Sequence, residues 1–427
     1  MADILGYKTL SKVPVGFYFC IFIFFINSME WWPGWEGRTK WINIATVIML
    51  FISLYNYYYV KFVFDTKKIS LVLILTLCFY YFTREISAFA YMIVYLVIVC
   101  LRNDYQSMCL QYIYKWFAWL MVPCIIVYFF AQVGIMPSFG TLHTIDDVIN
   151  TYFSSEYTTR SNYLFYCYSP FYGIRFNGPF IEPGHLGMIT AFLLFADGFN
   201  FKKKETWILL FTTLLTMSLS GIMLALLGFF LIKYEQKKIK IAFIIIFGVG
   251  ILLIYLFGTF YRGGDNIVNE YVLSRLEYDE ERGFSGNNRV FGQIDLYYAA
   301  MFNDTHTMMF GYDKETIEYL AWNNSRGTGY VMCMVSHGIV GTIAGVLFYI
   351  IYSIWYYHKR TTIVFLIFVL MMFWQRTYPF WFSWLICFVF GLSNRKKTIY
   401  ENRNSNIPPQ SQLRSIVTGN CITQSNI

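Results

Sequence analysis

Three side chains that could do chemistry lie close together in one short segment of the sequence. They are Arg175, Glu182 and His185, in the run Arg-Phe-Asn-Gly-Pro-Phe-Ile-Glu-Pro-Gly-His. The glycines and prolines of this run exclude an ordinary helix and predict an irregular backbone just before a helix start. Backbone N–H groups at a helix start, with an arginine beside them, suit an anion such as a phosphate.

Glu182 is the candidate general base or acid of this segment. It lies between Ile181 and Pro183, and partial desolvation near a membrane surface raises the pKa of a carboxyl group. The alternative is that Glu182 pairs with Arg175 and holds the shape of the loop. His185 either moves a proton or caps the helix that follows it.

A second polar segment follows later in the chain. Arg289 comes after two asparagines, has no acid beside it, and precedes the apolar run Val290–Met301, which we predict to be an amphipathic helix over the membrane face. Arg289 therefore either binds a substrate phosphate or makes structural hydrogen bonds. We take Arg175, Glu182 and Arg289 as catalytic, and predict these substrate-binding residues: Gly178, His185, Arg262, Arg275, Asn288 and Asn324.

The sequence contains no motif for a metal or a nucleotide. The nine cysteines show no metal-binding spacing, and the chain has no phosphate-binding loop, nucleophile elbow or zinc-protease motif. We therefore predict no metal and no cofactor. An activated nucleotide sugar is not the expected donor of a group-transfer reaction.

The composition is that of a polytopic α-helical membrane protein. The chain is 57% hydrophobic and only 14% charged, with a mean hydropathy of +0.47, far from the values of a soluble protein. We predict twelve transmembrane spans: Val13–Met29, Trp41–Val60, Ile69–Phe82, Ile86–Leu101, Tyr112–Met136, His185–Phe199, Thr206–Leu219, Gly221–Ile232, Ile239–Gly258, Gly329–Tyr357, Thr361–Gln375 and Tyr378–Leu392.

The distribution of positive charge predicts the orientation. In the twelve-span layout 21 of the 33 lysines and arginines lie on the side of the termini and 12 on the other side, which places both termini in the cytoplasm. The outer set has 10 arginines and 2 lysines, and arginine is preferred where phosphate or carboxylate is gripped by two hydrogen bonds. The net charge of +8 comes from lysines that flank spans, so no nucleic-acid partner is expected.

The predicted domain organisation is simple. Residues 1–393 form one transmembrane domain with two long outer loops, about 137–184 and 259–328, and residues 394–427 form a polar, disordered cytoplasmic tail. The junction between Leu219 and Gly221 is either a kink or a tight hairpin. The last long span is expected to break at His337 and Gly338, with His337 packed against another helix.

The layout and several short motifs resemble the Wzy-type polysaccharide polymerases of the O-antigen ligase and polymerase group. The motifs are Arg175-x-x-Gly-x-x-x-Glu-Pro-Gly before a span, Ser218-Leu-Ser-Gly at an outer helix break, Asn288-Arg289, Phe310-Gly-Tyr, and Asn324 ahead of a span that carries Gly338-x-x-Gly341. The resemblance covers about residues 1–393. The related ligases carry a histidine shortly before that span, where this chain has Trp322-Asn-Asn-Ser.

The resemblance implies an all-α membrane protein of the GT-C type that works at the outer face of the bacterial inner membrane. Such an enzyme joins oligosaccharide repeat units carried on undecaprenyl diphosphate into O-antigen, capsule or exopolysaccharide, beside a chain-length regulator and a flippase of the same pathway. It implies that Arg175 and Arg289 bind the diphosphate. Neither ATP nor an obligatory metal is implied, because the diphosphate is already an activated leaving group.

Three other functions remain alternatives. A glycan ligase would transfer finished polymer from the carrier lipid to an acceptor. A lipid-linked glycan flippase or other transporter would place charges deep within its helices and often shows repeated halves. A pure assembly partner for other membrane enzymes is the third. The concentration of arginine in the outer loops favours chemistry at the outer surface.

Overall fold

The fold is seen in a computed structural model. It describes residues 15–27, 63–84, 86–134, 143–147, 158–163, 166–168, 173–180, 182–236, 255–266, 268–269, 278–279, 283–284, 293–322, 329–356, 359–375 and 379–405, together with residues 44, 48, 51, 252 and 273.

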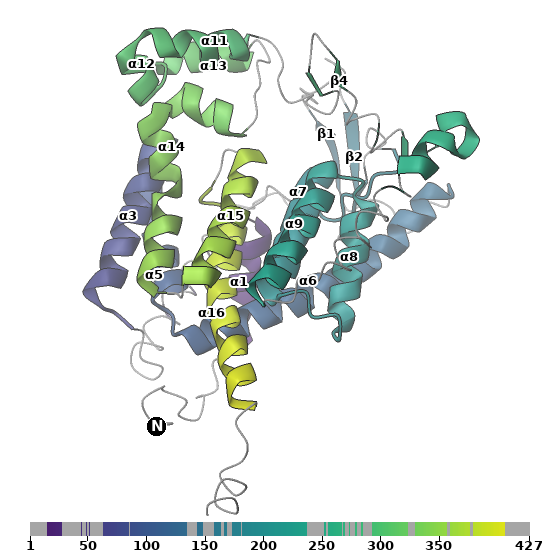
Figure 1. Cartoon of the computed structure of the whole chain (residues 1–427), viewed down its shortest axis with the longest axis horizontal. Helices are drawn as coiled ribbons and strands as arrows, with labels where there is room; N and C mark the ends of the chain where they lie inside the picture. Colours follow the sequence, from purple (N-terminus) through teal and green to yellow (C-terminus); the bar gives the residue numbers. More distant parts are fainter. Residues whose placement is uncertain are drawn as a thin grey trace, which may run out of the picture.

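Helices make up most of the described chain, as expected for a helical membrane protein (Figure 1). They are α1 (Val15–Asn27), α3 (Thr66–Thr83), α4 (Ser87–Ala90), α5 (Met92–Cys100), α6 (Asn103–Gln132), α7 (Pro183–Asp197), α8 (Lys204–Leu215), α9 (Leu219–Glu235), η3 (Tyr261–Gly264), α11 (Ile294–Ala300), η6 (Met301–Asn303), α12 (Thr305–Phe310), α13 (Lys314–Trp322), α14 (Gly329–Tyr356), α15 (Lys359–Gln375) and α16 (Phe382–Ser405).

Short strands, which we did not predict, lie in both of the segments expected to be outer loops. β1 (His143–Asp147), β2 (Thr158–Tyr163) and β3 (Tyr166–Tyr168) form an antiparallel sheet in that order, with Ile145 opposite Arg160 and Asn162 opposite Cys167. β4 (Tyr278–Asp279) pairs with β5 (Gly283–Phe284). The hydrophobic periodicity that identifies helices does not report such short polar strands.

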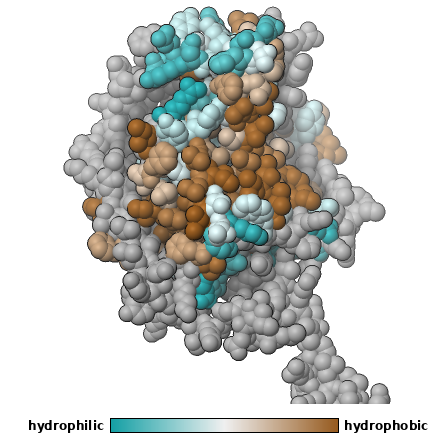
Figure 2. Space-filling view, turned by 90° about the vertical axis from the view of Figure 1, so that its left-hand side faces the viewer, coloured by the Kyte–Doolittle hydropathy of each residue, from teal (hydrophilic) through white to brown (hydrophobic). Residues whose placement is uncertain are grey.

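Among the described residues, the three helices α3, α6 and α14 are long and apolar enough to cross a membrane. Figure 2 shows a hydrophobic band across the middle of one face of the molecule, with hydrophilic side chains above and below it. Exposed apolar side chains of α3 and α14 include Ile69, Leu73, Leu77 and Ile343. A soluble protein rarely exposes so large an apolar surface, so these features support residence in a membrane.

Ten of the twelve predicted spans coincide with described helices, the span Ile86–Leu101 with the pair α4 and α5. Most of the other two, 41–60 and 239–258, lies outside the described residues. The helix α6 begins at Asn103, well before the predicted Tyr112, because its first turns satisfy their polar groups. Arg102 pairs with Asp104 at 2.5 Å, and the Gln106 side chain donates to the Ile98 carbonyl.

α6 is oblique to the other long helices in Figure 1. Its 30 residues span roughly 45 Å at 1.5 Å per residue, which exceeds the roughly 30 Å hydrocarbon core of a bilayer. A helix of that length fits a bilayer by tilting. The tilted α6 runs obliquely past the other helices and contacts α1, α8 and α16.

We name the two ends of the bundle for what they carry. At the loop end lie α11, α12, α13 and the strands, and at the tail end α16 finishes (Figure 1). α7 and α9 both begin at the loop end and run to the tail end. α8 ends at Leu215 and α9 begins at Leu219, so the junction is a tight hairpin rather than a kink.

The central helix of the bundle is α7, whose residues are all buried. It is apolar on every side, as a helix surrounded by protein must be, and it packs against α9, α16 and α8. Phe195 of α7 stacks on Phe368 of α15 with ring centroids 4.1 Å apart. α7 is therefore surrounded by neighbouring helices.

The predicted break in α14 is confirmed at Gly338, where φ is 65° and ψ is −167°. Gly311, at the end of α12, also has a positive φ of 80°. The two glycines bring the backbones of α12 and α14 into contact, and the Tyr312 amide donates to the Val335 carbonyl at 2.9 Å. His337 packs against the Phe82 ring of α3 at 4.7 Å, as expected.

Residues 394–405 differ from our prediction of a disordered tail, and the rest of the predicted tail, residues 406–427, lies outside the described residues. α16 continues to Ser405, and Asn394 and Arg395 are buried. The Arg395 guanidinium donates to Glu235 Oε2 at 2.6 Å, and Thr361 Oγ1 donates to Glu235 Oε1 at 2.7 Å. The helix extends because these partners accept its polar side chains, which composition alone does not reveal.

Candidate anion-binding site at the start of α7 and α9

Aromatic packing on α6 anchors the segment that carries Arg175. The Tyr128 hydroxyl donates to the Ile174 carbonyl at 2.6 Å. The Phe176 side chain is fully buried and stacks on Tyr166 of β3, with ring centroids 5.8 Å apart. The aromatic residues of the first loop thus hold the backbone on either side of Arg175.

A tight turn follows at residues 177–180. The Asn177 side-chain amide donates to the Phe180 carbonyl at 2.7 Å, and the Phe180 N–H donates to the Asn177 carbonyl at 2.9 Å. Gly178 has a φ of +54°, and a Cβ there would lie 3.1 Å from Leu186. Gly178 therefore supplies the turn conformation and is buried, while its predicted role in substrate binding stays a prediction.

Arg175 is held against the hairpin between α8 and α9. Its Nε donates to the Thr216 carbonyl at 3.3 Å, and the next N–H, of Phe176, donates to the Leu215 carbonyl at 3.0 Å. Within the hairpin Met217 has a left-handed φ of 46°. Such conformations in non-glycine residues cost free energy and cluster at functional sites.

The two helices beside Arg175 start with different caps. Glu182 is the N-cap of α7, where its side chain makes no capping hydrogen bond, and Pro183 is the first helical residue. Ser218 is the N-cap of α9, where its Oγ accepts from the Gly221 N–H at 3.4 Å. Proline at the first position and serine at the N-cap are both common helix starts.

The starts of α7 and α9 are brought together by two glycines. A Cβ on Gly221 would lie only 2.7 Å from the backbone of Gly187, and a Cβ on Gly187 would lie 2.9 Å from Thr216 Oγ1. Only residues without a side chain allow so close a crossing. Two helix N-termini, each with the partial positive charge of its helix dipole, therefore face the same end of the molecule.

Glu182 and His185 form a polar pair at this end. Glu182 Oε2 lies 3.4 Å from His185 Nε2, and the His185 ring makes an edge contact with Trp381, with centroids 5.6 Å apart. The His185 backbone N–H also donates to the Glu182 carbonyl at 3.1 Å. A carboxylate and an imidazole this close can share a proton, which is the chemistry expected of a general base.

A buried row of hydroxyl groups behind the pair was not predicted from sequence. Thr213 donates to Thr190 at 2.8 Å, the Thr216 hydroxyl accepts from the Ser218 N–H at 3.2 Å, and Ser218 shares a hydrogen bond with Ser220 at 3.0 Å. These bonds tie α7, α8 and α9 together below the site. The serine and glycine run at residues 218–221 was the one sequence signal for it.

The structure therefore gathers Arg175, Glu182 and His185 where α7 and α9 begin. Arg262 is exposed in η3, with its guanidinium 5.5 Å from the Tyr261 ring centroid, and none of the contacts of the described residues joins it to α7. The predicted residues Arg275, Asn288, Arg289 and Asn324 lie outside the described residues. Their roles stay predictions.

Within the described ranges, no group of three or more histidine, cysteine, aspartate or glutamate side chains is arranged to hold a metal ion. Comparison with protein families, with characterised proteins and with solved structures found no match to this chain.

Proposed function

We propose that the protein is a polysaccharide polymerase of the Wzy type, which joins oligosaccharide units carried on a lipid diphosphate. The observation that carries the proposal is the convergence of Arg175 with the N-termini of α7 and α9. Two helix starts and a guanidinium form a site for a strongly negative group. The diphosphate group of a membrane lipid has that charge, and it reaches the protein from the bilayer.

The proposed reaction is a glycosyl transfer. A hydroxyl oxygen of the acceptor sugar attacks the anomeric carbon of the donor glycan and forms the new glycosidic bond. The bond between that carbon and the diphosphate oxygen breaks, and the diphosphate leaves with the electron pair. The hydroxyl proton passes to a base, so the products are a longer lipid-linked glycan and free lipid diphosphate.

Each site residue has a proposed part in this step. Arg175 and the helix N–H groups stabilise the charge that develops on the leaving diphosphate, which is the largest electrostatic demand of the reaction. Glu182 takes the acceptor proton and can exchange it with His185, 3.4 Å away. Arg289 is proposed as a second diphosphate ligand. Arg262, Arg275, Asn288 and Asn324 are proposed to bind the substrates.

The setting of the proposal is the bacterial inner membrane, with both termini in the cytoplasm and the loop end outside. Both substrates are lipids, so they reach the site within the bilayer and need no soluble carrier. A flippase must deliver the units to the outer face, and a chain-length regulator is the second expected partner.

The test compares surface glycan from a deletion strain complemented with wild type, Arg175→Ala or Lys314→Ala. Lys314 is the matched control, because it is a cation at the loop end whose side chain is 83% exposed and makes only a surface ion pair with Glu318. We expect about a 100-fold loss of polymerisation in Arg175→Ala, which corresponds to about 2.7 kcal/mol of transition-state stabilisation. The Lys314 variant should match the wild type.

The glycan pattern distinguishes the alternatives. A ladder in the wild type that shortens to a single unit on the acceptor, in the deletion strain and in Arg175→Ala, supports the polymerase. Long polymer that stays on the carrier lipid in the deletion strain would assign a ligase instead. Loss of single units from the outer face would assign a flippase. A normal ladder in Arg175→Ala would overturn the proposed role of the arginine.

A further inference from the structure

A second polar site lies at the tail end, far along α7 from the site above. A cavity of about 270 Å³ opens there between α6 and the start of α8. Its lining residues are Gln111, Tyr112, Tyr114, Lys115, Lys203 and Glu205. The proposed glycosyl transfer uses none of them.

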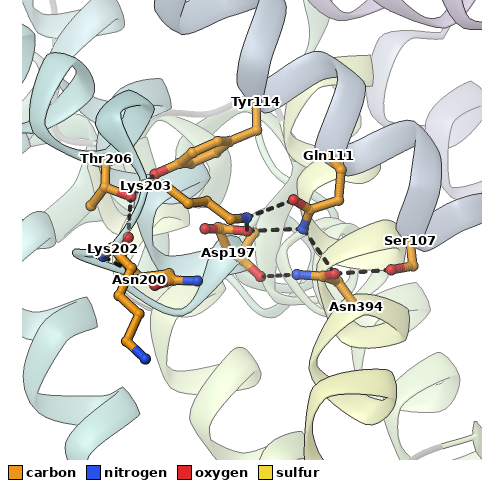
Figure 3. Close-up of polar contacts among 10 residues, drawn as sticks. Ser107, Gln111, Tyr114, Asp197, Asn200, Lys202, Lys203, Thr206 and Asn394 are labelled. Atoms are coloured by element: carbon orange, nitrogen blue, oxygen red, sulfur yellow. Dashed lines mark hydrogen bonds and ion pairs between the residues drawn. The ribbon is translucent and has the colours of Figure 1, made fainter. Parts of the chain in front are cut away.

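The floor of the cavity is a hydrogen-bonded cluster. Lys203 Nζ donates to Asp197 Oδ1 at 2.7 Å and to Gln111 Oε1 at 2.6 Å (Figure 3). Gln111 also donates to Asp197 at 2.9 Å and to Asn394 at 3.0 Å. Because the Asp197 side chain is only 1% exposed, this cluster holds α6, α7 and α16 in fixed relative positions.

The aromatic walls are fixed as well. The Tyr114 hydroxyl shares a hydrogen bond with Thr206 at 2.8 Å, and Lys203 Nζ lies 5.4 Å from the Tyr114 ring centroid. The Tyr112 ring packs on Tyr18 of α1, with centroids 4.6 Å apart. The cavity is thus a preformed shape rather than a gap between mobile side chains.

The charge around the cavity is positive overall. The lining carries Lys115, Lys203 and one acid, Glu205, and Lys203 is paired with Asp197. The adjoining turn adds two exposed lysines, Lys202 and Lys204, so four lysines stand against two acids. In the part of the chain that the structure describes no acid forms an ion pair with Lys115. A cavity with an excess of lysines and a tyrosine wall favours an anion such as a phosphate.

Two exposed tryptophans lie on the helices that form the cavity. Trp119 of α6 is 48% exposed and donates to Glu205 at 3.3 Å. Trp207 of α8 is 56% exposed and donates to the Phe201 carbonyl at 3.0 Å. Exposed tryptophans with satisfied N–H groups are typical of the boundary between hydrocarbon and water.

We propose that this cavity binds the phosphate of a phospholipid head group, with Lys115 as its main cation. At about 30 Å³ for each water-sized group, the cavity has room for roughly nine such groups, enough for a phosphodiester and part of its head group. The lipid chains would lie along the exposed apolar side chains of α6, such as Ile126 and Phe129. The Lys203–Asp197–Gln111 cluster forms the rigid floor.

The test uses the full chain, reconstituted in vesicles of phosphatidylethanolamine and phosphatidylglycerol and then released into mild detergent. Native mass spectrometry counts the phospholipids that stay bound to the wild type, to Lys115→Gln and to Lys67→Gln. Lys67 is the matched control, because it is an exposed lysine in the first turn of α3 and does not line the cavity. Both variants lose one positive charge at an exposed side chain.

We expect Lys115→Gln to bind phospholipid with about tenfold lower affinity, which corresponds to a loss of about 1.4 kcal/mol in binding free energy. Lys67→Gln should bind as much phospholipid as the wild type. Equal losses in the two variants would show only a diffuse attraction to the membrane and would overturn the site, as would full retention in Lys115→Gln. A further arm offers inorganic phosphate to the delipidated wild type. Phosphate binding that depends on Lys115, without retention of phospholipid, would overturn the assignment to a lipid.

Discussion

Replacement of Gly221 by alanine tests the close crossing of α7 and α9. The new Cβ would lie 2.7 Å from both the Cα and the carbonyl carbon of Gly187. These are backbone atoms, so the clash cannot be relieved by a rotamer change, and the helices must move apart. Overpacking of this kind costs roughly 1–3 kcal/mol, and alanine returns up to about 1 kcal/mol through its higher helix propensity. Taking the upper end of the clash, we expect a net loss of about 2 kcal/mol.

The measurement is the free energy of unfolding of the purified protein in mixed micelles, titrated with a denaturing detergent. Gly16→Ala in α1 is the matched control, because a Cβ at Gly16 meets nothing within 4 Å, and it should leave the protein equally or more stable. The Gly221 variant should also lose glycan transfer, since the two helix N-termini separate. If Gly221→Ala is as stable as Gly16→Ala and as active as the wild type, the close contact between the backbones of α7 and α9 is contradicted.

Three further predictions concern other parts of the chain. Gly338→Ala should separate α12 from α14, because only glycine readily adopts this backbone conformation and a Cβ would lie 2.3 Å from a carbonyl oxygen of α12. Limited proteolysis of residues 305–322 should then become faster, and an unchanged rate of digestion would contradict the contact. Arg395→Met should destabilise the protein by about 3–5 kcal/mol, because it leaves the Glu235 carboxylate buried without its cation, and a loss below about 1 kcal/mol in the detergent titration would refute this. Hydrogen bonds from the Thr307 hydroxyl and N–H hold the pKa of Asp304 below its ordinary value of 3.8. Its capping contribution to α12 is therefore fully present above pH 3.8 and is lost only as the pH falls through the lower folded value. Proteolysis of α12 should show this step in the wild type and not in Asp304→Asn, and loosening of the wild type well above pH 3.8 would contradict it.

The sequence was sufficient to predict most of the helices and the break within α14. Long apolar runs locate helices because a membrane or a buried core requires them. The break in α14 was predicted from the glycine beside His337. Gly338 has a positive φ of 65°, which glycine adopts readily because it has no side chain. The start of α7 was predicted at His185, with Pro183 and Gly184 before the helix. In the structure the helix begins at Pro183 instead, because proline is favoured at the first helical position.

Contacts between distant residues were beyond reach of the sequence. Gln111, Asp197 and Asn394 are far apart in the chain, and nothing local indicates that they share hydrogen bonds. For the same reason Asn394 and Arg395 were assigned to a disordered tail by their polar composition. Their hydrogen-bond partners lie on other helices, and these bonds offset the free-energy cost of burying the two polar side chains.

The candidate site was predicted in part. The run from Arg175 to His185 was identified by its residue types, and the structure places Arg175, Glu182 and His185 at one end of the bundle. The approach of α9, which supplies the second helix start, depends on the fit between Gly187 and Gly221. That fit is a property of two helices in space and has no signature in either segment alone.

The most direct test of the proposed function uses purified protein in vesicles with an oligosaccharide linked to undecaprenyl diphosphate. The products to be measured are longer lipid-linked glycans together with free undecaprenyl diphosphate. The proposal predicts that the wild type releases one undecaprenyl diphosphate for each glycosidic bond formed, without added metal or nucleotide, and that Arg175→Ala slows the formation of both products about 100-fold. If a substrate of the matching pathway yields neither product with the wild type, or both products at the wild-type rate with Arg175→Ala, the proposed chemistry at the start of α7 and α9 is contradicted.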